Sequence, residues 1–126
     1  MKDDTDQVVV FVCEHGAFRS RIAAAYFNGA APVGWTALSA GVTPQTEVSA
    51  RLGPLMTGSG VEEYLDVGQP RPLHGLSAVR VIAIDADVPG AETWRTANAT
   101  TDAELRDEIS KRVEGLVAEV EGKPAL

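Results

Sequence analysis

The segment that decides the fold is residues 8–27, which read VVVFVCEHGAFRSRIAAAYF. Its first part, residues 8–12, is a continuous apolar run of strand length, which is typical of a strand buried on both faces of a parallel sheet. Cys13 follows this run and is the only cysteine in the chain. A short loop containing Gly16 comes next, and residues 20–28 predict a helix. The segment therefore predicts a cysteine at the carboxyl end of a strand, in a loop that leads into a helix.

The middle of the chain continues the alternation of strands and helices. Residues 35–39 and 79–84 predict two more strands, and residues 92–95 predict a short edge strand. A helix is predicted over residues 46–56, where Gly53-Pro54 interrupts the pattern. Residues 61–73 contain Pro70 and Pro72 and are predicted to be irregular.

The last helix has the clearest pattern. Thr101 and Glu104 have the spacing of a capping box, and apolar residues recur behind them every three or four positions, at Leu105, Ile109, Val113, Leu116 and Val120. The alternation of elements predicts an α/β fold in one domain, residues 1–126, with flexible ends at 1–6 and 122–126. We expect a three-layer sandwich, in which a four-stranded parallel sheet carries helices on both faces.

The spacing of Cys13 and Arg19 has a chemical meaning in this setting. Amides of a tight loop at a helix N-terminus favour negative charge at one point, and such a field promotes formation of a nucleophilic thiolate. The planar guanidinium of Arg19 can hold two oxygens of a tetrahedral anion, and the hydroxyl of Ser20 can donate to the sulfur. We therefore predict that Cys13 and Arg19 are catalytic and that the remaining loop residues bind the oxyanion: Glu14, His15, Gly16, Ala17, Phe18 and Ser20.

This loop resembles the signature of the low-molecular-weight protein tyrosine phosphatases and of the arsenate reductases that share their fold. The resemblance implies that Cys13 is the nucleophile, Arg19 the oxyanion-binding arginine and Ser20 the hydroxyl that supports the thiolate. Gly16 stands where the family usually has asparagine, in a left-handed conformation that glycine also adopts. The segment 39–41 resembles the end of the family's second strand, and residues 105–116 resemble the final helix of single-cysteine arsenate reductases.

The general acid of the family lies in an Asp-Pro pair shortly after a tryptophan. Counted from Trp94, that place holds Asn98-Ala99 here, and asparagine has no titrating proton to donate. Candidate substitutes for the acid are Asp85, Asp87 and Asp102, and the sequence does not select among them.

Composition excludes several classes of function. The formal net charge is −7 and there is no basic run, so nucleic acid and acidic membranes are poor partners. His15, Arg19 and Arg21 predict a local positive site in this acidic chain. No apolar run reaches membrane-spanning length and no signal core precedes the first strand, so we expect a cytoplasmic protein. One cysteine with two histidines excludes a conventional structural zinc cluster, and we expect no metal and no cofactor.

Three functions remain open from the sequence. The first is thiolate-based hydrolysis of a phosphate ester, as in the low-molecular-weight phosphatases. The second is reduction of arsenate, in which a single cysteine requires an external small thiol such as mycothiol or glutathione, with a redoxin as a further partner. The third is binding of phosphate, arsenate or a phosphorylated ligand without turnover. No aromatic residue occurs in residues 42–47 after the second predicted strand, so a flat slot for phosphotyrosine is not supported.

Overall fold

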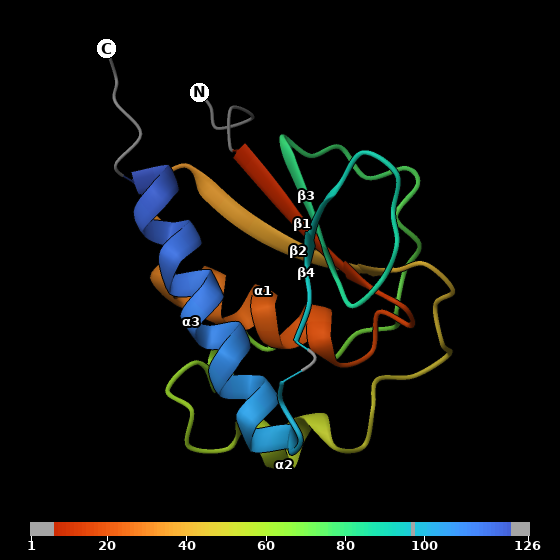
Figure 1. Ribbon diagram of the computed structural model, residues 1–126, viewed down its shortest axis with the longest axis vertical. Coiled ribbons are helices and arrows are strands. Elements are labelled where there is room, and N and C mark those ends of the chain that lie inside the picture. The colour runs from red at the N-terminus through yellow and green to blue at the C-terminus, as the bar shows by residue number, and fades with distance from the viewer. Residues whose placement is uncertain (1–6, 97, 122–126) are drawn as a thin grey trace.

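The computed structural model describes residues 7–96 and 98–121. Its centre is a four-stranded parallel sheet in the order β2-β1-β3-β4 (Figure 1). The strands are β1 (Gln7–Cys13), β2 (Trp35–Gly41), β3 (Arg80–Ile84) and β4 (Glu92–Trp94). The helices are α1 (Arg19–Ala30), α2 (Leu52–Met56) and α3 (Asp102–Glu121), with a 3-10 helix, η1 (Glu62–Tyr64).

Strand β1 lies inside the sheet because it is apolar on both faces. Val9 and Phe11 face one hydrophobic cluster, Val10 and Val12 face the other, and all four are fully buried. The chain passes from β1 to β2 on one side and returns to β3 on the other. The carboxyl end of β1 therefore lies at the point where the strand order reverses, which is where open α/β sheets bind ligands.

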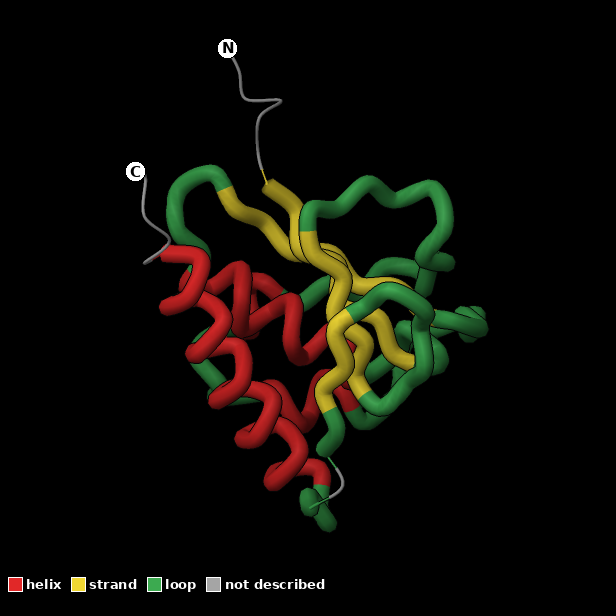
Figure 2. Tube along the Cα trace, turned by 45° about the horizontal axis from the view of Figure 1, so that its top comes forward, coloured by secondary structure: helices red, strands yellow, loops and turns green. Residues whose placement is uncertain are grey.

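The predicted α/β class and the four-stranded parallel sheet are confirmed, but the helices do not lie on both faces. The larger cluster contains the buried apolar residues of α1, α2 and α3. The smaller cluster is completed by loop residues instead, which are Leu73, Leu76, Ala78, Val88 and Ala91. Figure 2 shows the helices on one side of the sheet and loops on the other. Two connections cover that face without a helix. Residues 85–91, between β3 and β4, are fewer than the dozen or so that a parallel crossover with a helix needs. Residues 65–79, which lead into β3, are irregular.

The helix predicted over residues 46–56 is also shorter than expected, since only Leu52–Met56 is helical. Pro54 is tolerated near its start, where a backbone N–H is not required. The residues before it run along the loop that follows β1. The segment between η1 and β3 is irregular, as predicted. The predicted flexible ends, 1–6 and 122–126, lie outside the described residues. Within the described ranges, no helix combines the length and apolarity needed to cross a bilayer.

Candidate active site: the loop between β1 and α1

Cys13 lies at the carboxyl end of β1, and Ser20 holds its sulfur from the first turn of α1. The Cys13 side chain is 5% exposed. Its thiol donates to the Ser20 hydroxyl at 3.3 Å, and the Ser20 backbone N–H donates to the sulfur at 3.4 Å. If Cys13 loses its proton, both groups of Ser20 can donate to the thiolate. The structure thus brings the predicted nucleophile and its predicted supporting hydroxyl together.

The carbonyl groups of the loop are all turned away from its interior. Those of Cys13, Glu14, His15 and Ala17 accept hydrogen bonds of 2.7–3.1 Å from the amides of Val42, Thr43, Gln45 and Ser49. The Gly16 carbonyl accepts from the Arg21 side chain. In a trans peptide the N–H points opposite to the carbonyl, so outward carbonyls turn the following amides inward. Among the described residues, the amides of 14–19 donate to no other backbone group. The loop therefore presents a nest of free N–H groups next to the sulfur.

Two glycines allow the loop to sit directly on the end of β2. Gly16 has a φ of +63°, and a Cβ atom there would lie 2.7 Å from the Gly41 nitrogen. A Cβ atom on Gly41 would in turn lie 2.6 Å from the Gly16 nitrogen. Each position excludes a side chain because of the other backbone. The left-handed conformation predicted for Gly16 is confirmed. Gly41, the last residue of the segment 39–41, must also be glycine, because a side chain there would collide with the loop.

Arg19 closes the loop and is held by Asp85, which directly follows β3. The Arg19 Nε lies 3.0 Å from a carboxylate oxygen of Asp85, as an ion pair without an aligned hydrogen bond. Asp85 has a φ of +53° and accepts hydrogen bonds from the backbone N–H and the hydroxyl of Thr96. Burial works to raise the pKa of Asp85, but the bonds from Thr96 and the charge of Arg19 outweigh it and lower that pKa. Asp85 is therefore an anion at neutral pH that orients Arg19.

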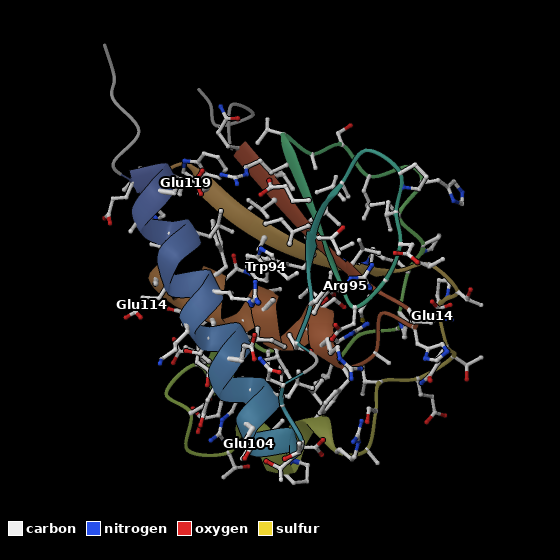
Figure 3. All side chains as sticks on the ribbon, in the orientation of Figure 1. Glu14, Trp94, Arg95, Glu104, Glu114 and Glu119 are labelled. Carbon is white, nitrogen blue, oxygen red and sulfur yellow. The ribbon has the colours of Figure 1, made fainter. Side chains whose placement is uncertain are left out.

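A cavity of about 170 Å³ opens above the loop. Its lining residues are Cys13, Glu14, His15, Ala17, Phe18, Arg19, Gln45, Ser49 and Arg51. Arg51 was not predicted from the sequence. Its guanidinium lies 4.3 Å from the centre of the Phe18 ring and forms an ion pair of 2.9 Å with Asp102. Glu14 is exposed at the outer edge of the molecule (Figure 3), so its carboxylate lies at the rim of this cavity.

No protein-family model matches the chain, and no curated protein matches it. Solved structures do. An arsenate reductase from Archaeoglobus fulgidus matches with a TM-score of 0.70 and 26% identity, over 88% of this chain and 99% of that one. The YwlE arginine phosphatase from Geobacillus stearothermophilus matches with a TM-score of 0.72 and 18% identity, over 91% of this chain and 93% of that one. The chain has the low-molecular-weight phosphatase fold.

A third structure with this fold is longer. The thioredoxin-dependent arsenate reductase Cg_ArsC1′ from Corynebacterium glutamicum matches with a TM-score of 0.72 and 22% identity. The match covers 95% of this chain and 64% of that one, so this chain spans just under two thirds of its length. The low-molecular-weight phosphatase fold thus includes both phosphatases and reductases among the structures that this chain resembles.

The three candidate acids are not equivalent within this fold. Asp85 contacts Arg19, as described. Asp102 reaches the cavity only through Arg51, and Asp87 is 91% exposed and pairs with Arg95. None of the three lines the cavity. Asn98 lies in an exposed turn before α3. Among the described residues, no group of three His, Cys, Asp or Glu side chains is placed to hold a metal ion.

The predicted positive site near His15 is only partly present. Arg19 is 41% exposed and His15 is exposed, but Arg21 is 1% exposed and faces away from the cavity. Arg51 supplies the second positive charge of the cavity instead. The spacing of the two arginines could have predicted that Arg21 faces away from the cavity. It lies two positions after Arg19 and therefore about 200° further around the helix. No comparable signal pointed to Arg51, because a non-local contact with Phe18 places it.

Proposed function

We propose that the chain is a cysteine-dependent phosphatase of the low-molecular-weight type, acting on a phosphate ester in the cytoplasm. The observation that carries this proposal is the loop itself, in which Ser20 supports the Cys13 sulfur and outward carbonyls leave the amides free. The Cys13 thiolate forms a bond to phosphorus while the bond from phosphorus to the leaving oxygen breaks. Water then displaces the sulfur and releases inorganic phosphate.

Arg19 and the loop amides stabilise the charge on the transferring oxygens. Asp85 fixes Arg19 through Nε and leaves the two terminal nitrogens for the anion. Asp85 is ionised and Asn98 has no proton to give, so neither of them protonates the leaving group. Esters with acidic leaving groups are then the preferred substrates. Asp87 and Asp102 remain candidate acids, and both are already paired with arginines.

The first test is alkylation of Cys13 with and without saturating phosphate. Because Cys13 is the only cysteine, the intact mass of the protein reports alkylation of this site alone. We expect fast alkylation at neutral pH and protection by phosphate. Turnover of aryl phosphates should rise steeply as the leaving group becomes more acidic, and Cys13→Ser should abolish it. Turnover that persists in Cys13→Ser would reject the mechanism.

Two further variants test the roles of the clamp and of the missing acid. Arg19→Lys should lose phosphate protection, because a point charge cannot replace a planar fork, while Arg95→Lys, an exposed arginine away from the cavity, should not. Asn98→Asp should raise turnover of esters with poor leaving groups and leave good ones unchanged. An equal change in turnover for all leaving groups in Asn98→Asp would contradict the proposal that position 98 lacks a general acid.

Arsenate reduction is the second candidate, favoured by the arsenate reductases among the matching structures, of which two are described above. Cys13 then forms a bond to arsenic while an arsenic–oxygen bond breaks and the oxygen leaves as water. A second thiol attacks the Cys13 sulfur, the sulfur–arsenic bond breaks, and arsenic passes from the +5 to the +3 state as the two thiols are oxidised to a disulfide. With one cysteine in the chain, the second thiol is a small molecule of the mycothiol or glutathione type, and a redoxin restores it. Arsenate-dependent consumption of such a thiol, without phosphate ester turnover, would select this function. Anion protection without either turnover would indicate a binding protein.

A further inference from the structure

Arg21 is the largest of the fully buried side chains, at 1% exposure. Arginine is almost never buried to this extent unless its charge is paired and its donors are satisfied. Its position makes the burial more notable, because it lies in the first turn of α1, directly behind the anion loop. The cavity does not include it. Because Arg21 does not reach the proposed anion site, its burial must have another cause.

The contacts of Arg21 are directed at the apex of the loop. Its Nε donates to the Gly16 carbonyl at 2.8 Å, and a terminal nitrogen donates to the Asp66 carbonyl at 2.6 Å. The same terminal nitrogen lies 3.7 Å from the Asp66 carboxylate. Gly16 is the residue with the left-handed backbone. Arg21 thus links Gly16, whose backbone is left-handed, to the segment that contains Asp66.

That segment is itself anchored to the end of β2. The Asp66 carboxylate accepts from the Gly68 amide at 2.8 Å and from Arg71 at 3.0 Å. The Arg71 carbonyl accepts from the Gly41 amide at 2.9 Å. Gly41 is the residue on which Gly16 rests. A closed circuit of contacts therefore runs from Gly16 through Arg21, Asp66 and Arg71 to Gly41 and back.

The charges in this circuit are maintained. Burial works to raise the pKa of Asp66, but the Gly68 amide and the charges of Arg21 and Arg71 lower it overall, so the carboxylate stays ionised. Burial and the positive charge of Arg71 lower the pKa of Arg21, while attraction to Asp66 and to the Cys13 sulfur acts in the opposite direction. An arginine remains protonated under these conditions. The positive charge behind the loop is thus permanent and is attracted to the nucleophile.

We propose that Arg21 is a positioning residue of the anion site, which fixes the direction of the amide between Gly16 and Ala17. By holding the Gly16 carbonyl outward, it turns the Ala17 N–H into the loop, because the two groups point in opposite directions in a planar trans peptide. Gly16 cannot hold this orientation alone, since glycine has wide conformational freedom. The Asp66 carbonyl and carboxylate, in turn, hold the guanidinium.

This inference rests on the proposed anion site, and its test separates the two. Phosphate affinity is measured as protection of Cys13 from alkylation, and the Ala17 amide is followed by nitrogen-15 NMR during a phosphate titration. The variants are Arg21→Met and Arg21→Lys. The control is Arg106→Met, which removes another arginine that donates to a backbone carbonyl, that of Leu55, far from the loop in sequence. Urea unfolding establishes that each protein is folded.

In the wild-type protein we expect the Ala17 amide resonance to shift on addition of phosphate. In folded Arg21→Met, phosphate affinity should fall by about tenfold or more, as expected for loss of a hydrogen bond to a charged ligand, and the Ala17 shift should be lost. Arg21→Lys, which keeps a donor and the charge, should partly restore both, and it decides the question if Arg21→Met does not fold. Arg106→Met should bind phosphate as the wild-type protein does.

The negative outcomes are distinct. If phosphate neither protects Cys13 nor shifts Ala17 in the wild-type protein, the proposed function fails and this inference fails with it. If the wild-type protein binds phosphate and the folded Arg21 variants bind within twofold of it with the same Ala17 shift, Arg21 has only a structural role and the inference is overturned.

Discussion

Replacing Gly41 by alanine tests whether the anion loop is seated directly on the end of β2. The new Cβ atom would lie 2.6 Å from both the Gly16 nitrogen and the His15 carbonyl carbon. Carbon atoms pack at about 3.5–4.0 Å, so the loop backbone must move by roughly 1 Å. Gly41 is not among the described residues with positive φ, so alanine adds no backbone strain there. Any loss of stability or of phosphate affinity must therefore come from this contact.

The expected magnitude follows from the nature of the atoms in contact. Overpacking against rigid neighbours costs about 1–3 kcal/mol of unfolding free energy, and both neighbours here are main-chain atoms. Because the displaced backbone carries the amides that we propose bind the anion, phosphate affinity should also fall, by roughly tenfold for each charged hydrogen bond that is lost. Urea unfolding followed by circular dichroism measures the first quantity, and protection of Cys13 from alkylation measures the second.

Gly115→Ala is the matched control for this experiment. Gly115 is exposed on α3, and a Cβ atom there meets nothing within 4 Å. Alanine should raise the unfolding free energy by about 0.5–1 kcal/mol, because glycine is unfavourable inside a helix, and phosphate affinity should not change. If Gly41→Ala unfolds like the wild-type protein and binds phosphate within twofold of it, the steric argument for the Gly16–Gly41 contact is wrong.

Three other substitutions test separate features. The lowered pKa of Asp85 means that its ionised form stabilises the fold above the ordinary value of about 4 and that this contribution is lost as the pH falls through the lower folded value. Thermal melts from pH 5 to pH 2 should therefore show a larger loss for the wild-type protein than for Asp85→Asn, and equal losses would contradict the stabilisation of the ionised carboxylate by Thr96 and Arg19. Ser39 is 3% exposed, and its hydroxyl has no partner among the described residues. Ser39→Ala should leave the unfolding free energy unchanged or raise it by up to about 1 kcal/mol, and a clear loss in urea unfolding would reveal a missed partner. The Thr101 hydroxyl accepts from the Glu104 amide at 3.1 Å as an N-cap of α3. Thr101→Ala should lower the unfolding free energy by about 1 kcal/mol in the same assay. An unchanged unfolding free energy would show that the Thr101 hydroxyl does not stabilise α3.

The strands and the last helix could be predicted because their patterns are local. An apolar run at residues 8–12 has few alternatives to a buried strand, and the repeat from Leu105 to Val120 fits only a helix with one buried face. Local patterns do not show which face of the sheet each helix covers. That face depends on the connections, and the short segment 85–91 leaves no room for a helix between β3 and β4. The prediction of helices on both faces followed the general habit of parallel sheets rather than the length of this connection.

Within the candidate site, the sequence predicted the loop residues that the structure brings together and missed the residues that reach the loop from elsewhere. Cys13, Arg19 and Ser20 are close in sequence, so their spacing alone indicated their proximity. Arg51 and Asp85 come from other parts of the chain and meet the loop only through the packing of the sheet and of α3. A pattern of single residues holds no information on such pairings. For the same reason, Asp85 could be predicted as a candidate acid but not as the partner of Arg19.

The two arginines of the loop show how far local geometry can be taken. Each residue of an α-helix turns the side chain by about 100°, so Arg19 and Arg21 point in nearly opposite directions. Arg19 faces the cavity, 41% exposed, and Arg21 is buried behind the loop. One segment thus places a cation on each side of the same backbone. The front arginine is placed to contact the anion, whereas the rear arginine contacts the loop through the Gly16 carbonyl. Substitutions at the two positions should consequently differ in kind: Arg19→Lys removes contacts to the anion while the Ala17 amide keeps its direction, whereas Arg21→Met changes that direction and leaves the Arg19 side chain in place. A nitrogen-15 spectrum without phosphate separates them, because only the second variant should move the Ala17 resonance in the free protein.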